Sequence, residues 1–185
     1  MDSQLEGYLL QLTSITQELP GVVGGLSESQ FNWRPSASRW SIGQCIQHLN
    51  ITLERYLPVL DQAMSAGRSH GHVAEGPFVG TLVERWFIRS MEPPVRRRFM
   101  TPPSFVGAAE LPLESTLATW EQLHGRLARL IQESEGLDRR RVKVRSQFAP
   151  ISLGLGATFV VLLAHERRHL WQAREARLEM GSKAG

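Results

Sequence analysis

Two histidines near the end of the chain have the spacing of a metal-binding pair. His165 and His169 lie four residues apart in the apolar run ATFVVLLAHERRHLWQAREA, so on a helix both side chains project from one face, one turn apart. That spacing lets two imidazoles bind one metal ion. The segment reads HERRH, similar to the HExxH of zinc proteases, where the glutamate is a general base. A helical projection turns Glu166 away from the histidine face, so we interpret it as a surface charge.

A third ligand must come from elsewhere in the chain. His48 is the best candidate, because it lies beside the apolar stripe of a well-delimited predicted helix. His124 lies in another predicted helix but off its main stripe, and His70 and His72 lie in a glycine-rich loop that would position a ligand less well. A pair without any third ligand is also compatible with the spacing. Two buried imidazoles side by side would repel each other if protonated, which favours a metal between them.

Four other side chains are candidates for contact with a substrate or with the ligands. Gln172 lies one turn beyond the histidine pair and could orient a ligand, and Arg168 lies near the histidine face and could hold an anionic group. Thr52 lies one turn beyond His48, and Tyr56 could form part of a pocket wall. A solvated helix charge is the alternative interpretation of Arg168, and simple packing is that of Tyr56.

Composition points to an ordinary globular protein. The 185 residues are 42% hydrophobic and 21% charged, which suits one domain over residues 1–185 with a sizeable core. Cys45 is the only cysteine, so no intrachain disulfide can form, and a reducing cytoplasm is expected. The acidic start of the chain is unlike a signal peptide, and no apolar run is long enough to span a membrane.

The basic residues are mainly arginines, and two short runs concentrate them. We interpret Arg96–Arg98 and Arg139–Arg141 as solvated charge, because 18 acidic residues are interspersed and the net charge is only +3. No nucleic-acid-binding signature accompanies them. We therefore expect a small-molecule substrate, and neither a nucleic acid nor a membrane as a partner.

The spacing of apolar residues predicts four long amphipathic helices. They cover residues 3–19, 41–64, 113–133 and 152–180, and no strand pattern of substance is present. Residues 81–90 form a shorter helix or an extended segment, and we favour the helix. Pro20-Gly21 should end the first helix, Pro58 should kink or shorten the second, and Ser41 with Gln44 forms a capping box at the start of the second. These features predict an all-α four-helix bundle with a long crossover between helices two and three.

The last predicted helix is apolar on more than one side. Such a helix is either central in its own bundle or packs on a second subunit. A homodimer is therefore expected.

Several motifs taken together resemble the DinB superfamily of DinB/YfiT-like metalloenzymes. They are Trp33–Pro35, Arg39–Gly43, His48-Leu49 and the terminal segment His165–Gln172. The resemblance covers nearly the whole chain and implies a four-helix bundle with an unusual connection order. It also implies a divalent metal, commonly zinc or nickel, held by three histidines that correspond to His48, His165 and His169.

The resemblance also implies a range of possible reactions. Characterised relatives are transferases and isomerases that depend on a low-molecular-weight thiol such as mycothiol, bacillithiol or glutathione. We therefore expect a metal-dependent enzyme, with a thiol S-transferase as the first hypothesis. The alternatives are a metal-assisted hydrolase, which lacks an obvious general base, and a non-catalytic bundle that binds a metal, a small ligand or a protein.

Overall fold

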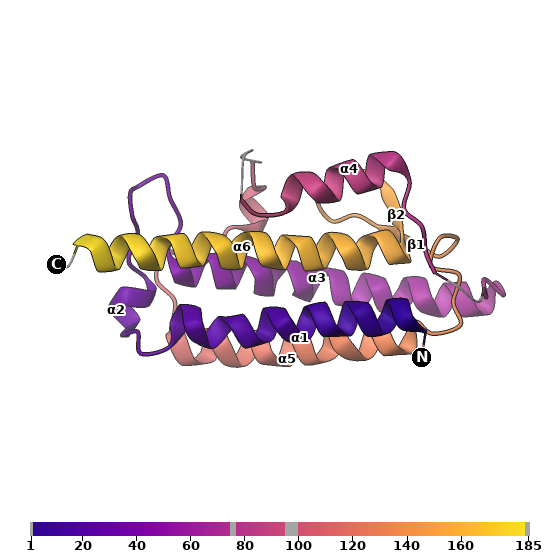
Figure 1. The fold of residues 1–185 in the computed structure, drawn as a ribbon, viewed down its shortest axis with the longest axis horizontal. Coiled ribbons are helices and arrows are strands. Elements are labelled where there is room, and N and C mark those ends of the chain that lie inside the picture. The colour runs from indigo at the N-terminus through magenta and orange to yellow at the C-terminus, as the bar shows by residue number, and fades with distance from the viewer. Residues whose placement is uncertain (1, 75–76, 95–99, 184–185) are drawn as a thin grey trace.

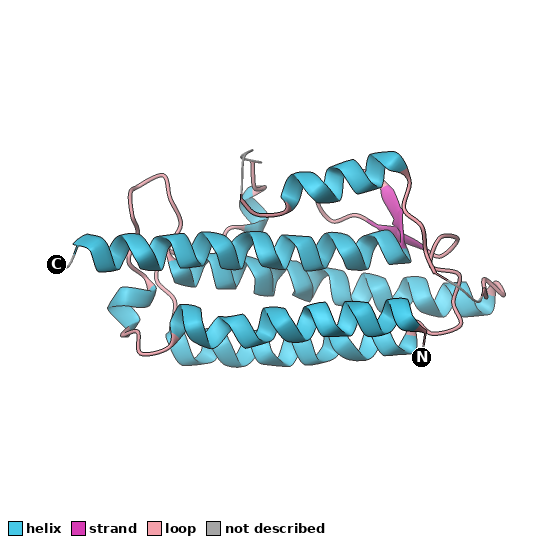
Figure 2. Ribbon diagram, in the orientation of Figure 1, coloured by secondary structure: helices cyan, strands magenta, loops and turns pink. Residues whose placement is uncertain are grey.

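A bundle of four long helices forms the body of the protein. The structure is a computed structural model that describes residues 2–74, 77–94 and 100–183 (Figure 1). The bundle helices are α1 (Ser3–Val23), α3 (Ile42–Ser69), α5 (Leu113–Glu133) and α6 (Leu155–Lys183). Helix α3 packs on α5 and α6, and α1 packs on the same two helices. The predicted fold class, an all-α bundle, is confirmed (Figure 2).

The long crossover explains the connection order of the bundle. Figure 1 shows that α3 and α5 run in the same direction, so the chain must return along the length of the bundle between them. The return contains α4 (Leu82–Met91), which lies against α6 on the outside of the bundle, and the 3-10 turn η1 (Pro103–Phe105). The short helix predicted at 81–90 is thus present, with Thr81 and Glu84 forming its capping box.

Two prolines lie inside helices that were expected to end at or near them. Pro20 lies in the last turn of α1, which continues to Val23 instead of stopping at Pro20-Gly21. Pro58 lies inside α3, which runs to Ser69, beyond the predicted end at Met64. The apolar stripe of α3 continues past Pro58 into the core, where Met64 is fully buried. Burial of that stripe outweighs the cost of a proline inside a helix, which is about 3 kcal/mol for the lost hydrogen bond and the clash of the ring together.

A small antiparallel sheet occupies the segment before the last helix. Strand β1 (Lys143–Arg145) pairs with β2 (Ser152–Gly154), although the sequence shows no strand pattern of substance. The last helix therefore begins at Leu155 and not near Ser152. Three-residue strands are too short to show a periodic pattern, and their pairing depends on packing against α3 and α6.

The interpretation of the arginine runs needs one correction. Arg139 is buried, with only 3% of its surface exposed, and its guanidinium forms an ion pair with Asp2 at 2.7 Å. Arg140 and Arg141 are exposed as expected. The run Arg96–Arg98 lies outside the described residues.

No helix in the described part of the chain is both long enough and apolar enough to cross a lipid bilayer.

Candidate metal centre

Two adjacent helices bring the three candidate histidines together. His48 lies in the first half of α3, and His165 and His169 lie in α6, which packs directly against α3. The start of α3 is held by the predicted capping box, in which the Gln44 amide donates to Ser41 Oγ at 3.0 Å and the Ser41 amide donates to Gln44 Oε1 at 3.2 Å. This cap sets where α3 begins, and the packing of α3 against α6 turns the face with His48 toward α6.

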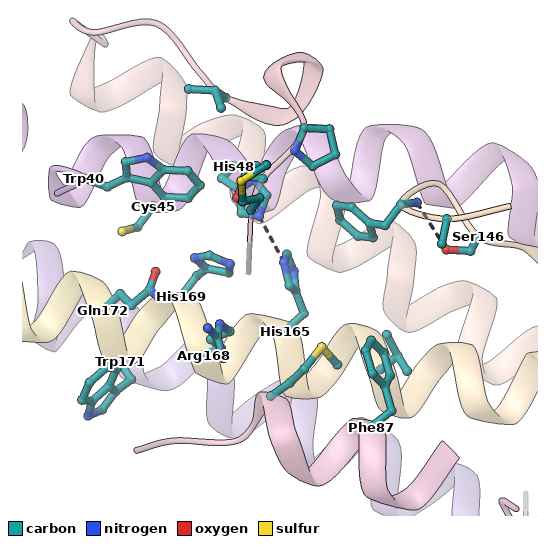
Figure 3. Close-up of a pocket in the computed structure, with 18 of the residues that line it drawn as sticks. Trp40, Cys45, His48, Phe87, Ser146, His165, Arg168, His169, Trp171 and Gln172 are labelled. Atoms are coloured by element: carbon teal, nitrogen blue, oxygen red, sulfur yellow. Dashed lines mark hydrogen bonds between the residues drawn. The ribbon is translucent and has the colours of Figure 1, made fainter. Parts of the chain in front are cut away.

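The three imidazoles converge on one point (Figure 3). Each ring offers one nitrogen, and these three atoms lie within 4.8 Å of one another. The Nε2 atoms of His48 and His165 are 3.1 Å apart. All three side chains are buried, with His165 the most exposed at 9%. The structure thus brings together the three residues that the resemblance assigned to a metal.

A hydrogen bond to the crossover orients the His48 ring. Its Nδ1 lies 2.9 Å from the backbone carbonyl oxygen of Phe105 in η1. A carbonyl oxygen can only accept, so Nδ1 carries the proton and Nε2 keeps its lone pair. That lone pair is directed toward the other two histidines. A metal-binding imidazole ordinarily has this kind of partner on its second nitrogen.

Burial keeps the three histidines neutral at physiological pH. Desolvation lowers the pKa of His48, and it lowers the pKa of His165 and of His169 well below the ordinary value of 6.5. The neighbouring histidines and Arg168 lower the pKa values of the two α6 histidines further. Neutral imidazole is the form that binds a metal ion.

The converging nitrogen atoms of the cluster fit a divalent cation. The Nε2 atoms of His48 and His165 face each other at 3.1 Å, and one nitrogen from each of the three rings lies within 4.8 Å of the others. Neutral imidazole nitrogens gathered in a buried site can all be satisfied by one shared metal ion. Three neutral nitrogen donors suit zinc, nickel and related ions, which imidazole binds readily. The residues present are therefore suited to hold one such ion.

Glu166 and His124 have roles different from those expected. Glu166 is not a surface charge, because it is 1% exposed and its Oε2 lies 3.1 Å from His124 Nε2. Its carboxylate is turned toward His124 of α5, away from the metal centre. Glu166 is therefore not placed as the general base of a zinc protease, although the reason is this contact and not exposure to solvent. His124 is 2% exposed, and its Nδ1 lies 2.7 Å from the Trp120 carbonyl oxygen. It forms part of this α5–α6 contact and not of the histidine cluster.

The other predicted site residues divide into two groups. Gln172, Arg168 and Tyr56 line the same cavity as the three histidines. Arg168 is buried and not a solvated helix charge, since only 5% of its surface is exposed. Thr52 does not line the cavity. Its hydroxyl donates to the backbone carbonyl of His48 at 2.8 Å, within α3.

Sequence reasoning missed aromatic residues that surround the centre. The ring of Trp40 stacks on His169 with 5.5 Å between centroids, and Phe148 lies 5.6 Å from His165. Trp40 stands directly before the α3 cap, and this position was a usable signal because a large aromatic side chain next to a helix start needs burial. Phe148 and Phe105 come from irregular segments, where no periodicity predicts which way a side chain points.

A large cavity opens beside the histidines. Its volume is about 1030 Å³, within the upper range of small-molecule sites. Its walls come from α6, α4, the start of α3 and the segment before β2. Tyr56 is fixed at this wall, because its hydroxyl accepts from the Gln147 amide at 3.1 Å and lies 3.2 Å from Ser146 Oγ.

Comparison with known proteins gives one structural neighbour and one family. The neighbour is YfiT from Bacillus subtilis, described as a probable metal-dependent hydrolase with an unusual four-helix bundle topology. The two structures superpose with a TM-score of 0.63 at 16% sequence identity, covering 98% of this chain and 90% of that one. A search of curated proteins finds no match. The family model of the DinB superfamily matches residues 11–173, which include all three histidines, and the chain therefore belongs to the DinB superfamily.

Proposed function

We propose that the protein is a metal-dependent enzyme in which His48, His165 and His169 hold one divalent cation. The observation that carries this proposal is the convergence of three buried, neutral imidazoles on the wall of a cavity large enough for a substrate. Three protein ligands are typical of catalytic metal sites, which keep a further position open for water or substrate. The description of YfiT as a probable metal-dependent hydrolase supports metal dependence in the same fold.

The favoured reaction is the transfer of a small thiol to an electrophilic carbon. A cation held by three neutral ligands would keep its full charge and would lower the pKa of a thiol bound at its open position. The thiol would release its proton to solvent water, and its sulfur would form a bond to the electrophilic carbon. That carbon would either release its leaving group with the bonding electron pair or pass an electron pair on to an atom that takes up a proton from water. Arg168, buried in the wall next to the histidines, would stabilise negative charge that develops there.

The thiol must be supplied from outside the chain. Cys45 also lines the cavity, but burial raises the pKa of its thiol to about 12. It therefore remains protonated at neutral pH and is a poor nucleophile. A low-molecular-weight thiol is accordingly proposed as a co-substrate.

Hydrolysis is the second candidate, and the description of YfiT favours it. It needs a carboxylate or another base close to the attacking water. The cluster itself contains only histidines among the described residues, and Glu166 faces His124 instead. Two carboxylates line the cavity, and Glu175 on α6 lies about 9 Å along the helix axis from His169. Thiol transfer needs no separate base and is therefore preferred.

A cobalt-substituted sample tests the proposal. One metal ion per chain is expected after purification and dialysis, and a small thiol should shift the visible absorption of the cobalt form. His165→Ala should abolish both signals, whereas His72→Ala, in the loop beyond α3, should leave them unchanged. Absence of bound metal from the purified protein and after reconstitution would refute metal dependence. Bound cobalt with no response to any small thiol, together with ester or amide hydrolysis, would favour the hydrolase.

A further inference from the structure

The cavity follows the axis of α6. The α6 residues that line it recur every three or four positions, with two adjacent pairs, and so lie on one broad helix face: Val161, His165, Arg168, His169, Trp171, Gln172 and Glu175. At 1.5 Å per residue, the stretch from Val161 to Glu175 covers about 21 Å. The three histidines lie near its middle. A ligand that fills the cavity must therefore be elongated and must pass the metal centre part-way along its length.

One end of the cavity is apolar. Val161 packs with Met91 of α4, and Leu153 of β2 packs on both. Ile151 and Phe87 also line this end. Figure 3 shows Phe87 beyond His165, on the opposite side from Gln172. Aliphatic and aromatic walls of this kind bind an alkyl or aryl group.

The other end carries the polar groups and a carboxylate. Gln172 and Glu175 lie there, with Ser38 and Arg39 from the loop before α3. The side chains of Trp40, Cys45 and Trp171 line the same end (Figure 3). The Arg39 guanidinium is already ion-paired with Glu179. The Glu175 carboxylate makes no hydrogen bond or ion pair with any described residue.

The second carboxylate that lines the cavity, Glu84 at the start of α4, already has hydrogen-bond partners. It accepts hydrogen bonds from both the backbone amide and the hydroxyl of Thr81. It is therefore engaged as the cap of α4. Glu175 is the cavity carboxylate whose charge is left for a ligand, and the complementary group is an amine.

We propose that the cavity binds an elongated amphipathic molecule with an amine-bearing head at Glu175 and an alkyl or aryl arm against Ile151, Leu153 and Val161. The atom between head and arm then faces the three histidines. This inference rests on the proposed function and names its substrate class. The co-substrate is an aminothiol, the electrophile carries an apolar group, and the product is a thioether that joins them.

Thioether probes test this without any thiol ionisation. S-methyl, S-butyl and S-octyl cysteamine carry the amine head, and the matching 3-(alkylthio)propionates carry a carboxylate head. Calorimetric titration of zinc-loaded and metal-free protein gives the affinities. Each methylene should raise affinity about three- to fourfold until the arm reaches the end of the cavity. The amine series should bind up to about fivefold more tightly than the carboxylate series.

Two variants, each with a matched control, test which end of the cavity binds the amine head and which binds the apolar arm. Glu175→Gln should remove the preference for the amine head, whereas Glu54→Gln, on the exposed face of α3, should not. Ile151→Ser should reduce the gain with chain length, whereas Leu178→Ser, exposed on α6 outside the cavity, should not. Ile151 is 53% exposed and Leu178 is 64% exposed, so neither change should unfold the protein.

The outcomes separate this inference from the proposed function. Affinity that does not rise with chain length, or equal binding of amine and carboxylate probes, would overturn the amphipathic ligand. Equal effects of a variant and its control would overturn it as well. Because thioethers carry no ionisable thiol, tight and selective probe binding in a protein whose cobalt form ignores thiols would reject thiol transfer and keep the ligand class.

Discussion

His48 has one ring nitrogen left for a metal, because its other nitrogen donates to the Phe105 carbonyl oxygen. The ring can therefore neither rotate freely nor change tautomer without losing a buried hydrogen bond. The Nδ1 atoms of His165 and His169 have no comparable backbone partner among the described residues. Their orientation depends instead on the helix and on packing, including the stack of Trp40 on His169. At the scale of single residues, His48 is the best preorganised ligand.

The first prediction concerns this residue. His48→Ala should lower the affinity for zinc by at least about 100-fold, because one of three ligands is lost and the remaining two come from one helix. Metal analysis after dialysis, with circular dichroism to check the fold, measures this. His70→Ala, in the exposed cap of the same helix, is the control. A His48→Ala protein that retains one tightly bound metal would contradict the assignment.

The 3-10 turn η1 determines where the Phe105 carbonyl lies. Arg55 of α3 fixes this turn, since its guanidinium donates to the Ser104 carbonyl at 2.6 Å and lies 4.2 Å from the centre of the Phe105 ring. An exposed arginine thus connects to the metal centre through a backbone segment. At the scale of elements, the crossover helps to complete the site, in addition to connecting two helices.

The second prediction follows from this connection. Arg55→Ala should weaken zinc binding by about three- to tenfold, less than loss of a ligand, because His48 remains but its partner becomes mobile. Arg55→Lys should restore only part of the affinity, since lysine cannot donate in the same fork. Competition with a chromogenic chelator measures both. Arg126→Ala, exposed on α5, should have no effect, and an equal loss there would indicate a general charge effect.

A buried polar contact joins α5 and α6 on the side of α6 away from the cavity. His124 Nδ1 faces the Trp120 carbonyl, so that nitrogen carries a proton. His124 Nε2 faces the Glu166 carboxylate at 3.1 Å, and that contact also requires a proton between the two atoms. The pair therefore holds a shared proton within the bundle.

The third prediction tests this pair. Glu166→Ala should lower the free energy of unfolding by about 1–3 kcal/mol, because it leaves His124 Nε2 buried without a partner. Glu166→Gln should cost less, since the carboxamide can donate to neutral His124. Chemical denaturation of the three proteins gives the values. A Gln variant as unstable as the Ala variant would show that the carboxylate itself is required.

At the scale of the whole molecule, the buried histidine cluster makes the free energy of unfolding depend on pH. Desolvation lowers the pKa values of all three histidines in the folded protein below the ordinary 6.5. As the pH falls through about 6.5, the unfolded chain therefore binds protons that the folded chain does not. The contribution of these histidines to the free energy of unfolding is therefore fully present above this pH. It is lost below it, as the pH falls toward the lowered pKa values.

The fourth prediction is a pH profile of stability. The free energy of unfolding of the metal-free protein should fall between pH 7 and pH 5 by up to about 1.4 kcal/mol per pH unit for each proton of difference. Urea denaturation at several pH values measures the slope. A variant with His165→Ala and His169→Ala should show a flatter profile. An equally steep profile in that variant would place the titrating groups elsewhere.

The apolar character of α6 has an explanation within one chain. The helix packs on α1 and α3 in the bundle and on α4 outside it, so its several apolar sides are covered. A central position, one of the two interpretations of its sequence, is thus correct. The homodimer stays a prediction, which sedimentation of the purified protein can test.

The local order of residues was sufficient to predict the helices, the Ser41 cap and the pairing of His165 with His169. These features depend on contacts within a few residues, where helical periodicity decides which side chains share a face. The same reasoning left His48, His124 and the absence of any third ligand as alternatives, because each of these two histidines lies in a helix whose rotation about its axis depends on its neighbours. The position of His48 beside its apolar stripe made it the best candidate, and the family resemblance favoured it further.

Tertiary packing decided the rest. It turned Glu166 into the core to meet His124, buried Arg139 against Asp2, and carried α1 and α3 past their prolines. It also placed the Phe105 carbonyl behind His48 and formed the cavity along α6. Each of these outcomes depends on residues far apart in the chain. A buried charge or an irregular segment takes its position from the partners that compensate it, and these partners meet only in the folded bundle.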